Sequence, residues 1–363
     1  MNYLVSKKYD LAFFLLPTFY SFMVAIGLEQ WSITWSLQAQ QVLQVVIFFI
    51  FVLGFDVSHV YASVYRIYFD KSEFRRRRFL YLGTPVIILV ISCSIYLISA
   101  LLFWRVLAYF AVIHFIRQQW GFISIYNHLN QKQNFNRLYE VWFDKAALYA
   151  GTLYPIIYWH THLPRKFEWF VKNNFIALPI EIDIIARFIA IIIMLGWVIN
   201  RIFKILKYSK YNLGKDLVMT GTWLVWFGGI VMYNSDLVFS ITNISIHGIS
   251  YVALIRITSI GFAKKKSIKS LTFFSKSVIR FLLLLFLLAY LEEFLWDNLV
   301  WFEHQNIFVR VLPNNSFVKS LAWVIIPLLS LPQITHYIID GFIWKMNEKK
   351  NPYLKEILFS EKH

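Results

Sequence analysis

The sequence is poor in cysteine and in charged residues. Its single cysteine, Cys93, lies within the apolar run Val86 to Leu102 and cannot form an internal disulfide. Charged residues make up only 15% of the 363 residues, against about 25% in an average soluble domain. Hydrophobic residues make up 58%. This composition excludes a disulfide-stabilised scaffold, disfavours an ordinary soluble domain and predicts an integral membrane protein.

Several well-known catalytic motifs are also absent. The sequence contains no Gly-rich phosphate loop, no Gly-x-Ser-x-Gly nucleophile elbow and no His-Glu-x-x-His zinc helix. It lacks the His-x-x-His-His boxes of membrane fatty-acid desaturases. Its loop from Glu29 to Ala39 lacks the acidic pair expected of a polyprenyl-phosphate-sugar glycosyltransferase. Any chemistry must therefore use side chains that are scattered along the chain.

Long apolar runs are what the sequence has instead. A bilayer core requires about 20 apolar residues per helix. Segments of this kind lie near 10–28, 40–65, 79–99, 102–127, 146–160, 178–200, 216–234, 237–260, 280–297 and 319–344. The first has no small-residue cleavage site and is interpreted as a retained helix. We predict an all-α, polytopic bundle of about ten transmembrane helices, forming one membrane domain over residues 1–363 with a short tail at 345–363.

The net charge of +16 is distributed between the apolar runs and not on a separate domain. With both termini on one side of ten helices, 28 of the 36 Lys and Arg residues lie on that side and 6 on the other. Basic loops are typical of the cytoplasmic side. The pattern predicts a multi-pass protein of the cell membrane with both termini cytoplasmic, and it argues against nucleic acid as a partner.

Four histidines lie inside the apolar runs, each in a different one: His59, His114, His247 and His336. An ionisable residue within a span costs about 2.5–3.5 kcal/mol on insertion scales, so each one marks a candidate site. The four segments all run from outside to inside in the predicted topology. At about 1.5 Å rise per residue, the histidines would lie within about 11 Å of one another along the membrane normal.

Each of these histidines has polar neighbours three or four residues away, on the same helix face. The neighbours are Asp56, Arg117, Gln118, Asn243, Tyr251 and Asp340. Histidines and carboxylates are typical ligands of non-haem iron with open coordination positions. We therefore predict a metal centre, with iron in a mono- or dinuclear site, held by the four histidines together with Asp56 and Asp340 as ligands or supporting groups.

Other interpretations of the same residues remain open. A lone histidine in a helix often only donates a hydrogen bond across a helix interface. Asp56 could pair with Arg66 or Arg117, and Asp340 could lie at a helix end near Lys345. Among the other histidines, His160 and His162 are predicted to be solvated at the interface, and His304 and His363 to be solvated. His128 is either a fifth ligand or exposed.

The four-histidine arrangement resembles the Brp/Blh-type carotene-cleaving membrane oxygenases. The resemblance covers only the neighbourhoods of the four histidines, and blocks such as Gln118-Gln119-Trp120-Gly121 do not map onto that family. It implies a multi-helix fold that binds iron through histidines on separate helices. It also implies iron-dependent oxidation of a lipid-soluble substrate.

The resulting functional hypothesis is a membrane-embedded, histidine-ligated oxidoreductase acting on a lipid or isoprenoid that enters from the bilayer. Arg117, Tyr251 and Tyr337 are candidate catalytic or substrate-contacting residues, and an electron donor is a possible further partner. The main alternative is a proton- or cation-coupled transporter that uses the same His, Asp and Arg residues. A third alternative is a membrane acyltransferase in which one histidine acts as a base.

Overall fold

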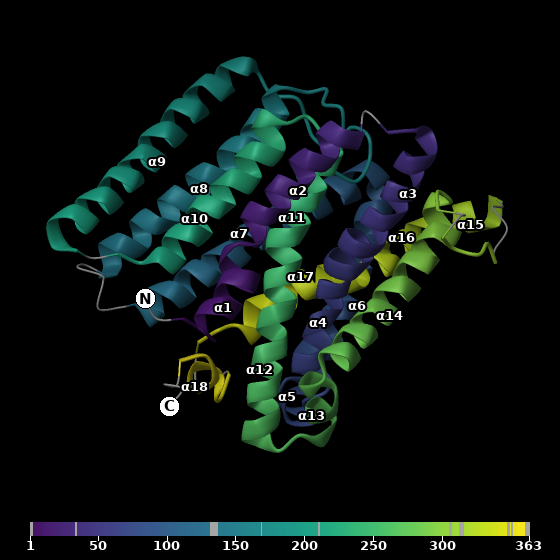
Figure 1. Ribbon diagram of the computed structural model, residues 1–363. Helices are drawn as coiled ribbons and strands as arrows, with labels where there is room; N and C mark the ends of the chain where they lie inside the picture. The colour runs from purple at the N-terminus through teal and green to yellow at the C-terminus, as the bar shows by residue number, and fades with distance from the viewer. Residues whose placement is uncertain are drawn as a thin grey trace. The chain divides into compact units, whose positions relative to one another are not determined.

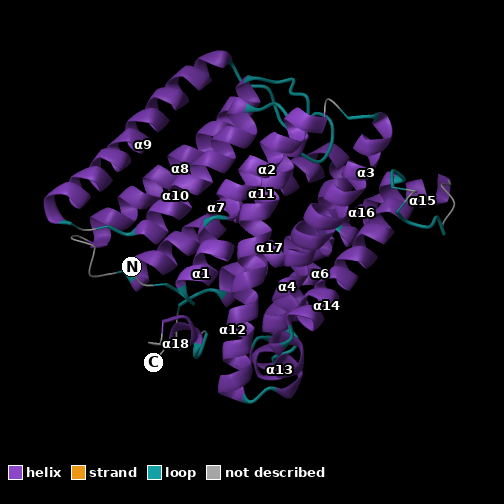
Figure 2. Cartoon of the chain, in the orientation of Figure 1, coloured by secondary structure: helices purple, strands orange, loops and turns teal. Residues whose placement is uncertain are grey.

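The protein is described here by a computed structural model that covers residues 3–32, 35–130, 137–167, 169–209, 211–304, 307–311, 316–346, 349 and 351–359. Every regular element within these ranges is helical, and none of the described residues forms a strand (Figures 1 and 2). The all-α prediction is therefore confirmed.

Several of these helices are long and apolar enough to cross a bilayer. Five meet this description by length and composition: Gln38–Ile67, Arg78–Ile98, Ala100–Leu129, Ile180–Tyr208 and Asp236–Lys266. Counting two bent helix pairs as single spans raises the number to seven; these are Lys7–Leu15 with Pro17–Trp31 and Ala322–Leu329 with Leu331–Ile343. The described part of the chain therefore contains five to seven candidate membrane-spanning segments. Ten spans and cytoplasmic termini stay predictions.

Both bends have a proline at or beside the break. The first pair is bent by 49° where helix α2 (Pro17–Ser32) begins at Pro17, and the second by 43° where Pro332 is the second residue of helix α17 (Leu331–Ile343). Proline has no backbone N–H and its ring clashes with the preceding helical turn. The chain can therefore change direction at these points.

The chain forms two compact units. Unit 1 comprises Met1–Trp35 and Ala111–Ser250, and unit 2 comprises Ser36–Phe110 and Tyr251–His363. The division falls within helix α7 (Ala100–Leu129) and after the first residue of helix α12 (Ser250–Lys266). The prediction of a single membrane domain with a tail at 345–363 stays a prediction.

In unit 1, helix α8 (Arg137–Thr161) packs along α9 (Ile180–Tyr208) and α10 (Leu213–Trp226) (Figure 1). Gly151 permits close packing, because a Cβ there would lie 2.1 Å from the Trp223 ring. Buried ion pairs also join the three helices. Lys215 Nζ lies 3.0 Å from Asp144 Oδ2, and Lys204 Nζ lies 2.9 Å from Glu140 Oε1.

The rest of unit 1 brings helix α2 against α11 (Asp236–Ile244), which continues through the π-helix η5 (Ser245–Ile249). The π-helices η1 (Leu11–Leu15) and η4 (Phe227–Met232) also belong to this unit, and the short helix α1 (Lys7–Asp10) leads into η1. The Ser250 hydroxyl donates to the Phe13 carbonyl at 2.9 Å, so the end of η5 is held against η1.

Unit 2 is built around helix α4 (Ser58–Ile67), which follows α3 (Leu37–Ile47) and the π-helix η2 (Phe48–Val57). Helices α14 (Val278–Trp296) and α17 both pack on α4, and α6 (Arg78–Ile98) packs on α17 and on α16 (Ala322–Leu329). The Tyr65 ring stacks on Phe281 with ring centroids 4.3 Å apart, and its hydroxyl donates to the Phe281 carbonyl at 2.9 Å.

The remaining elements of unit 2 are short. They are α5 (Lys71–Arg76), α13 (Lys269–Lys276), η6 (Asp297–Trp301), α15 (Ser316–Ser320) and α18 (Leu354–Phe359). Helix α18 and the residues before it are packed, because Asn351 and Leu354 are fully buried and Leu358 nearly so.

Candidate metal centre

Two of the predicted histidines form a buried pair in unit 1. His114 lies on α7 and His247 in η5, and their ring centroids are 5.0 Å apart at an interplanar angle of 77°. Both are almost completely buried. The Phe115 ring lies 4.2 Å from the His247 ring, between centroids. An aromatic ring therefore packs against the pair on the side of His247.

Gln118 holds these two histidine-bearing segments together. It follows His114 by one helical turn, and its side-chain amide donates to the His247 carbonyl at 2.8 Å. His247 itself lies in a π-helical turn, whose i→i+5 hydrogen bonding is rare and is frequently found at functional sites. Because this hydrogen bond holds the His247 carbonyl against α7, it limits the movement of His247 relative to His114.

The other two predicted histidines form a second buried pair, in unit 2. His59 is the second residue of α4, directly after η2, and His336 lies near the middle of α17. Their ring centroids are 5.1 Å apart at 77°, and both side chains are nearly inaccessible to solvent. The Tyr251 ring lies edge-on to His336, with centroids 5.0 Å apart.

Neighbouring groups orient the second pair. His59 Nδ1 lies 3.2 Å from the Phe55 carbonyl, which can only accept, so Nδ1 carries the proton and Nε2 is left with a lone pair. His336 Nδ1 lies 3.7 Å from Asp340 Oδ1, and that oxygen accepts a 2.5 Å hydrogen bond from the Tyr251 hydroxyl. Such partners behind a histidine ring are typical of ligating histidines.

The four buried histidines lie close together. Each offers one ring nitrogen, and these nitrogens all lie within 4.8 Å of one another. With metal–nitrogen bonds of about 2.0–2.1 Å, ligand nitrogens are about 3.4 Å apart around a tetrahedral ion and about 4.2 Å apart across an octahedral one. The 4.8 Å limit is wider than both values, so the rings would move slightly inward to hold one ion; in this way the four histidines could bind a metal ion, as the sequence predicted.

The two predicted carboxylate ligands lie beside the histidines. Asp56 Oδ1 is 3.9 Å from His59 Nδ1, and Asp340 Oδ1 is 3.7 Å from His336 Nδ1. Among the described residues, the group with converging ligand atoms contains histidines only. Asp340 is engaged by Tyr251, so its position suits a supporting carboxylate. A ligand role for Asp56 or Asp340 stays a prediction.

The candidate catalytic residues lie in different surroundings. Tyr251 and Tyr337 are buried, and the Tyr337 hydroxyl accepts a hydrogen bond from Gln333 Nε2 at 2.7 Å. Arg117 is exposed, one residue before Gln118 on α7. The two tyrosines therefore lie near the second histidine pair, whereas Arg117 points to the surface of its unit.

The remaining histidines lie outside the group of four converging histidines. His160 was predicted to be solvated, but it is buried, and its Nδ1 lies 2.7 Å from the Ile176 carbonyl. It connects the end of α8 to the segment that leads into α9. His162 stacks on Tyr158 at 3.8 Å between centroids. His304 is partly exposed and stacks on Phe48, His128 is partly buried, and His363 lies outside the described residues.

Two features of the site were not predicted. The π-helices have no signal in the sequence, because an i→i+5 turn has no distinct hydrophobic period. The hydrogen bond from Tyr61 to Glu292, at 2.5 Å, joins residues 231 positions apart and has no local signal. It places a further carboxylate on α14 beside α4.

Comparison with family models, curated proteins and solved structures finds no match to this chain.

Proposed function

We propose that His59, His114, His247 and His336 hold one metal ion inside a membrane protein. The observation that carries this proposal is the convergence of four buried ring nitrogens within 4.8 Å. Imidazole nitrogen suits iron, copper, zinc and nickel, whereas magnesium and calcium require oxygen ligands. Before a metal binds, neutral imidazoles cost less to bury in an apolar environment than charged ligands would.

We further propose iron, and oxidation of a lipid-soluble substrate. A bound redox-active iron would supply one-electron and oxygen chemistry that side chains alone cannot perform. The chain's own contribution is to orient His59 through the Phe55 carbonyl and His336 through Asp340, and to exclude water with aromatic rings such as Phe115 and Tyr251. The resemblance to carotene-cleaving oxygenases points in the same direction, with an electron donor as a further partner.

The membrane setting rests on five to seven spanning candidates and on the distribution of basic residues. We propose ten spans with both termini cytoplasmic, in the cell membrane. A substrate dissolved in the bilayer would then reach the histidines without crossing water. Exposed apolar side chains along α9, such as Phe188 and Ile199, are consistent with contact with lipid.

Metal analysis of the detergent-purified chain tests the metal centre. We expect about one transition-metal ion per chain in the wild type, and loss of most of it in each single His→Ala variant of the four. The His304→Ala variant is the matched control, because His304 is a partly exposed histidine outside the group. Wild-type protein without metal, or a variant lacking all four histidines that keeps its metal, would refute the proposal.

A transporter is the second candidate, and the two bent helix pairs favour it. Broken helices are common at the binding sites of secondary transporters. His336 lies in the second bent pair, five residues after Leu331, the first residue beyond the break. Substrate flux in proteoliposomes that depends on a proton gradient, and that persists after complete metal removal, would favour transport over oxidation.

A further inference from the structure

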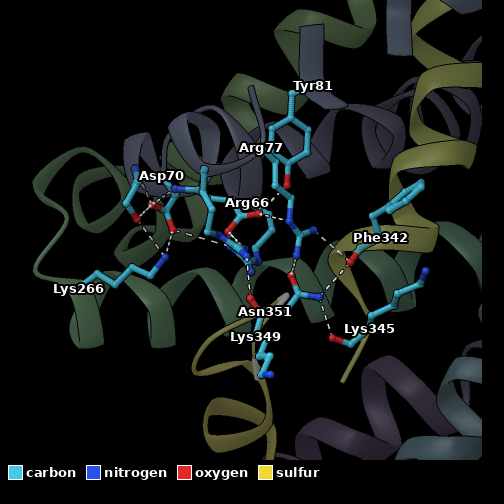
Figure 3. Close-up of polar contacts among 12 residues, drawn as sticks. Arg66, Asp70, Arg77, Tyr81, Lys266, Phe342, Lys345, Lys349 and Asn351 are labelled. Atoms are coloured by element: carbon cyan, nitrogen blue, oxygen red, sulfur yellow. Dashed lines mark hydrogen bonds and ion pairs between the residues drawn. The ribbon is translucent and has the colours of Figure 1, made fainter. Parts of the chain in front are cut away.

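Helices α4 and α17, which carry His59 and His336, end at one network of polar side chains (Figure 3). Arg66 lies in the last turn of α4, seven residues and about two turns after His59. The carbonyl of Phe342, at the end of α17, lies six residues after His336. Each end of the network is therefore connected to a histidine through a continuous stretch of helix.

The first part of the network surrounds Arg66. Its guanidinium lies over the Phe262 ring, 3.7 Å from the centroid, and is 1% exposed. Arg66 Nη1 is 3.7 Å from Asp70 Oδ2 and 4.0 Å from Glu73 Oε2. Both acids are fully buried. An ion pair shielded from water in this way holds the end of α4 against the segment that follows it.

Glu73 links Arg66 to Arg77, because its carboxylate lies near both guanidinium groups. Glu73 Oε1 accepts a 2.6 Å hydrogen bond from the Tyr81 hydroxyl and lies 3.5 Å from Arg77 Nε. Arg77 then donates through Nη1 to the Phe342 carbonyl at 3.3 Å and through Nη2 to Asn351 Oδ1 at 2.9 Å. The planar guanidinium presents donors on three separate nitrogens in a fixed fork, a geometry that the single nitrogen of a lysine cannot reproduce.

Asn351 completes the network from the C-terminal segment. Its Nδ2 donates to the Phe342 carbonyl at 2.9 Å and to the Lys345 carbonyl at 2.7 Å. The last carbonyls of a helix have no partner within the helix, so Asn351 satisfies this end of α17. Its side chain is buried and uses both its amide donor and its carbonyl oxygen.

Helix α18 holds Asn351 in place. Leu354 and Leu358 are buried. Ile357 packs closely on Gly261 of α12, because a Cβ added to Gly261 would lie 2.5 Å from Ile357 Cγ2. Lys265 of α12 forms an exposed ion pair with Glu356. Apolar contacts therefore hold the C-terminal segment in place, and the Asn351 side chain of this segment reaches the end of α17.

We propose that Arg66, Glu73, Arg77 and Asn351 form a brace that sets the spacing of His59 and His336, and that Asn351 is a positioning residue for the metal centre. Docking of residues 351–359 would then regulate how tightly the metal is held. This inference rests on the proposed metal centre for its functional consequence. The brace itself is a geometric claim about α4 and α17 and can be tested without metal.

The test compares Asn351→Ala and Asn351→Asp with the wild type in the full, detergent-purified chain. Aspartate keeps the acceptor for Arg77 but cannot donate to the Phe342 and Lys345 carbonyls. We expect the rate of metal loss to a chelator to rise about tenfold or more in both variants, the size seen when groups supporting a metal ligand are removed. Glu356→Gln is the control and should match the wild type, because it alters only an exposed ion pair of the same segment.

A distance measurement separates the brace from the metal proposal. Spin labels at Tyr68→Cys and Met346→Cys, two exposed positions just after α4 and α17, are placed in a Cys93→Ala background. We expect a broader distance distribution in both Asn351 variants at unchanged helical content. An unchanged distribution and an unchanged rate of metal loss would overturn the brace. A wild type without metal would refute only the metal centre, since the distance result would still decide the brace.

Discussion

The Tyr251 hydroxyl donates a 2.5 Å hydrogen bond to Asp340 Oδ1, the same oxygen that lies 3.7 Å from His336 Nδ1. Tyr251 belongs to α12 and Asp340 to α17, so the bond also ties two helices of unit 2 together. The 3.7 Å contact is longer than a hydrogen bond, but it places the carboxylate beside Nδ1, where a proton on that nitrogen would leave Nε2 as the ligand.

Replacing Tyr251 with phenylalanine removes this hydroxyl and little else. We expect the affinity for metal to fall about 10-fold or more, because Asp340 loses the group that orients it. The measurement is competition with a chelator. Tyr65→Phe is the control, since it also deletes a buried hydroxyl in unit 2 but one that donates to the Phe281 carbonyl. Equal metal affinity in Tyr251→Phe and wild type would show that the hydrogen bond does not support the site.

Replacing Gln118 with leucine should weaken the first histidine pair. The His247 carbonyl would lose its 2.8 Å donor inside a buried region, which costs about 1–3 kcal/mol of unfolding free energy. We expect a lower midpoint of unfolding together with reduced metal content. Gln119→Leu is the neighbouring control, because Gln119 accepts a long hydrogen bond from Thr222, at 3.4 Å. The prediction fails if the two variants lose metal to the same extent.

Acid should destabilise unit 2 through Asp70 and Glu73, which lie outside the membrane-spanning candidates. Burial alone would raise the pKa of Asp70, but hydrogen bonds from Lys266, Ser72 and the Glu73 backbone outweigh it and hold the pKa below its ordinary value of 3.8. Burial likewise opposes the lowered pKa of Glu73, which results from Arg76, Tyr81 and Arg66.

A lowered pKa in the folded state means that these carboxylates stabilise the fold above their ordinary pKa values of 3.8 and 4.5. That stability should be complete near neutral pH and should decrease as the pH falls below about 4.5. Unfolding midpoints measured between neutral and acidic pH check this. Asp70→Asn should unfold more easily at neutral pH and show a shallower acid dependence; an acid dependence identical to that of the wild type would contradict the assignment.

Replacing Lys215 with methionine should strongly destabilise unit 1. The substitution leaves Asp144 and Glu140 buried with one cation fewer, and breaking a buried pair in this way costs about 3–5 kcal/mol. Lys265→Met, which breaks the exposed pair with Glu356, should cost about 1 kcal/mol or less. Unfolding midpoints in a denaturing detergent, measured for the Lys215→Met and Lys265→Met variants, compare the two losses of stability. A double variant, Lys215→Met with Asp144→Leu, should recover part of the loss, and its failure to do so would argue against the buried pair as the cause.

Part of the fold could be predicted from apolar periodicity and length. Runs such as 79–99 and 102–127 correspond closely to Arg78–Ile98 and Ala100–Leu129, because continuous apolar stretches of this length have few alternatives to a helix in lipid. The bends and the π-helices could not be predicted in this way. They depend on how neighbouring helices satisfy the backbone groups that Pro17 or a wider turn leaves unpaired.

The amino-acid sequence by itself identified the four histidines of the candidate site. His59, His114, His247 and His336 were identifiable because an ionisable side chain in an apolar span is costly and is kept only for a reason. Only the tertiary structure decided how they pair and what supports them. His114 faces His247, His59 faces His336, and Asn351 reaches the end of α17 from the C-terminal segment. Contacts across such sequence distances depend on helix packing, which leaves no local pattern in the sequence.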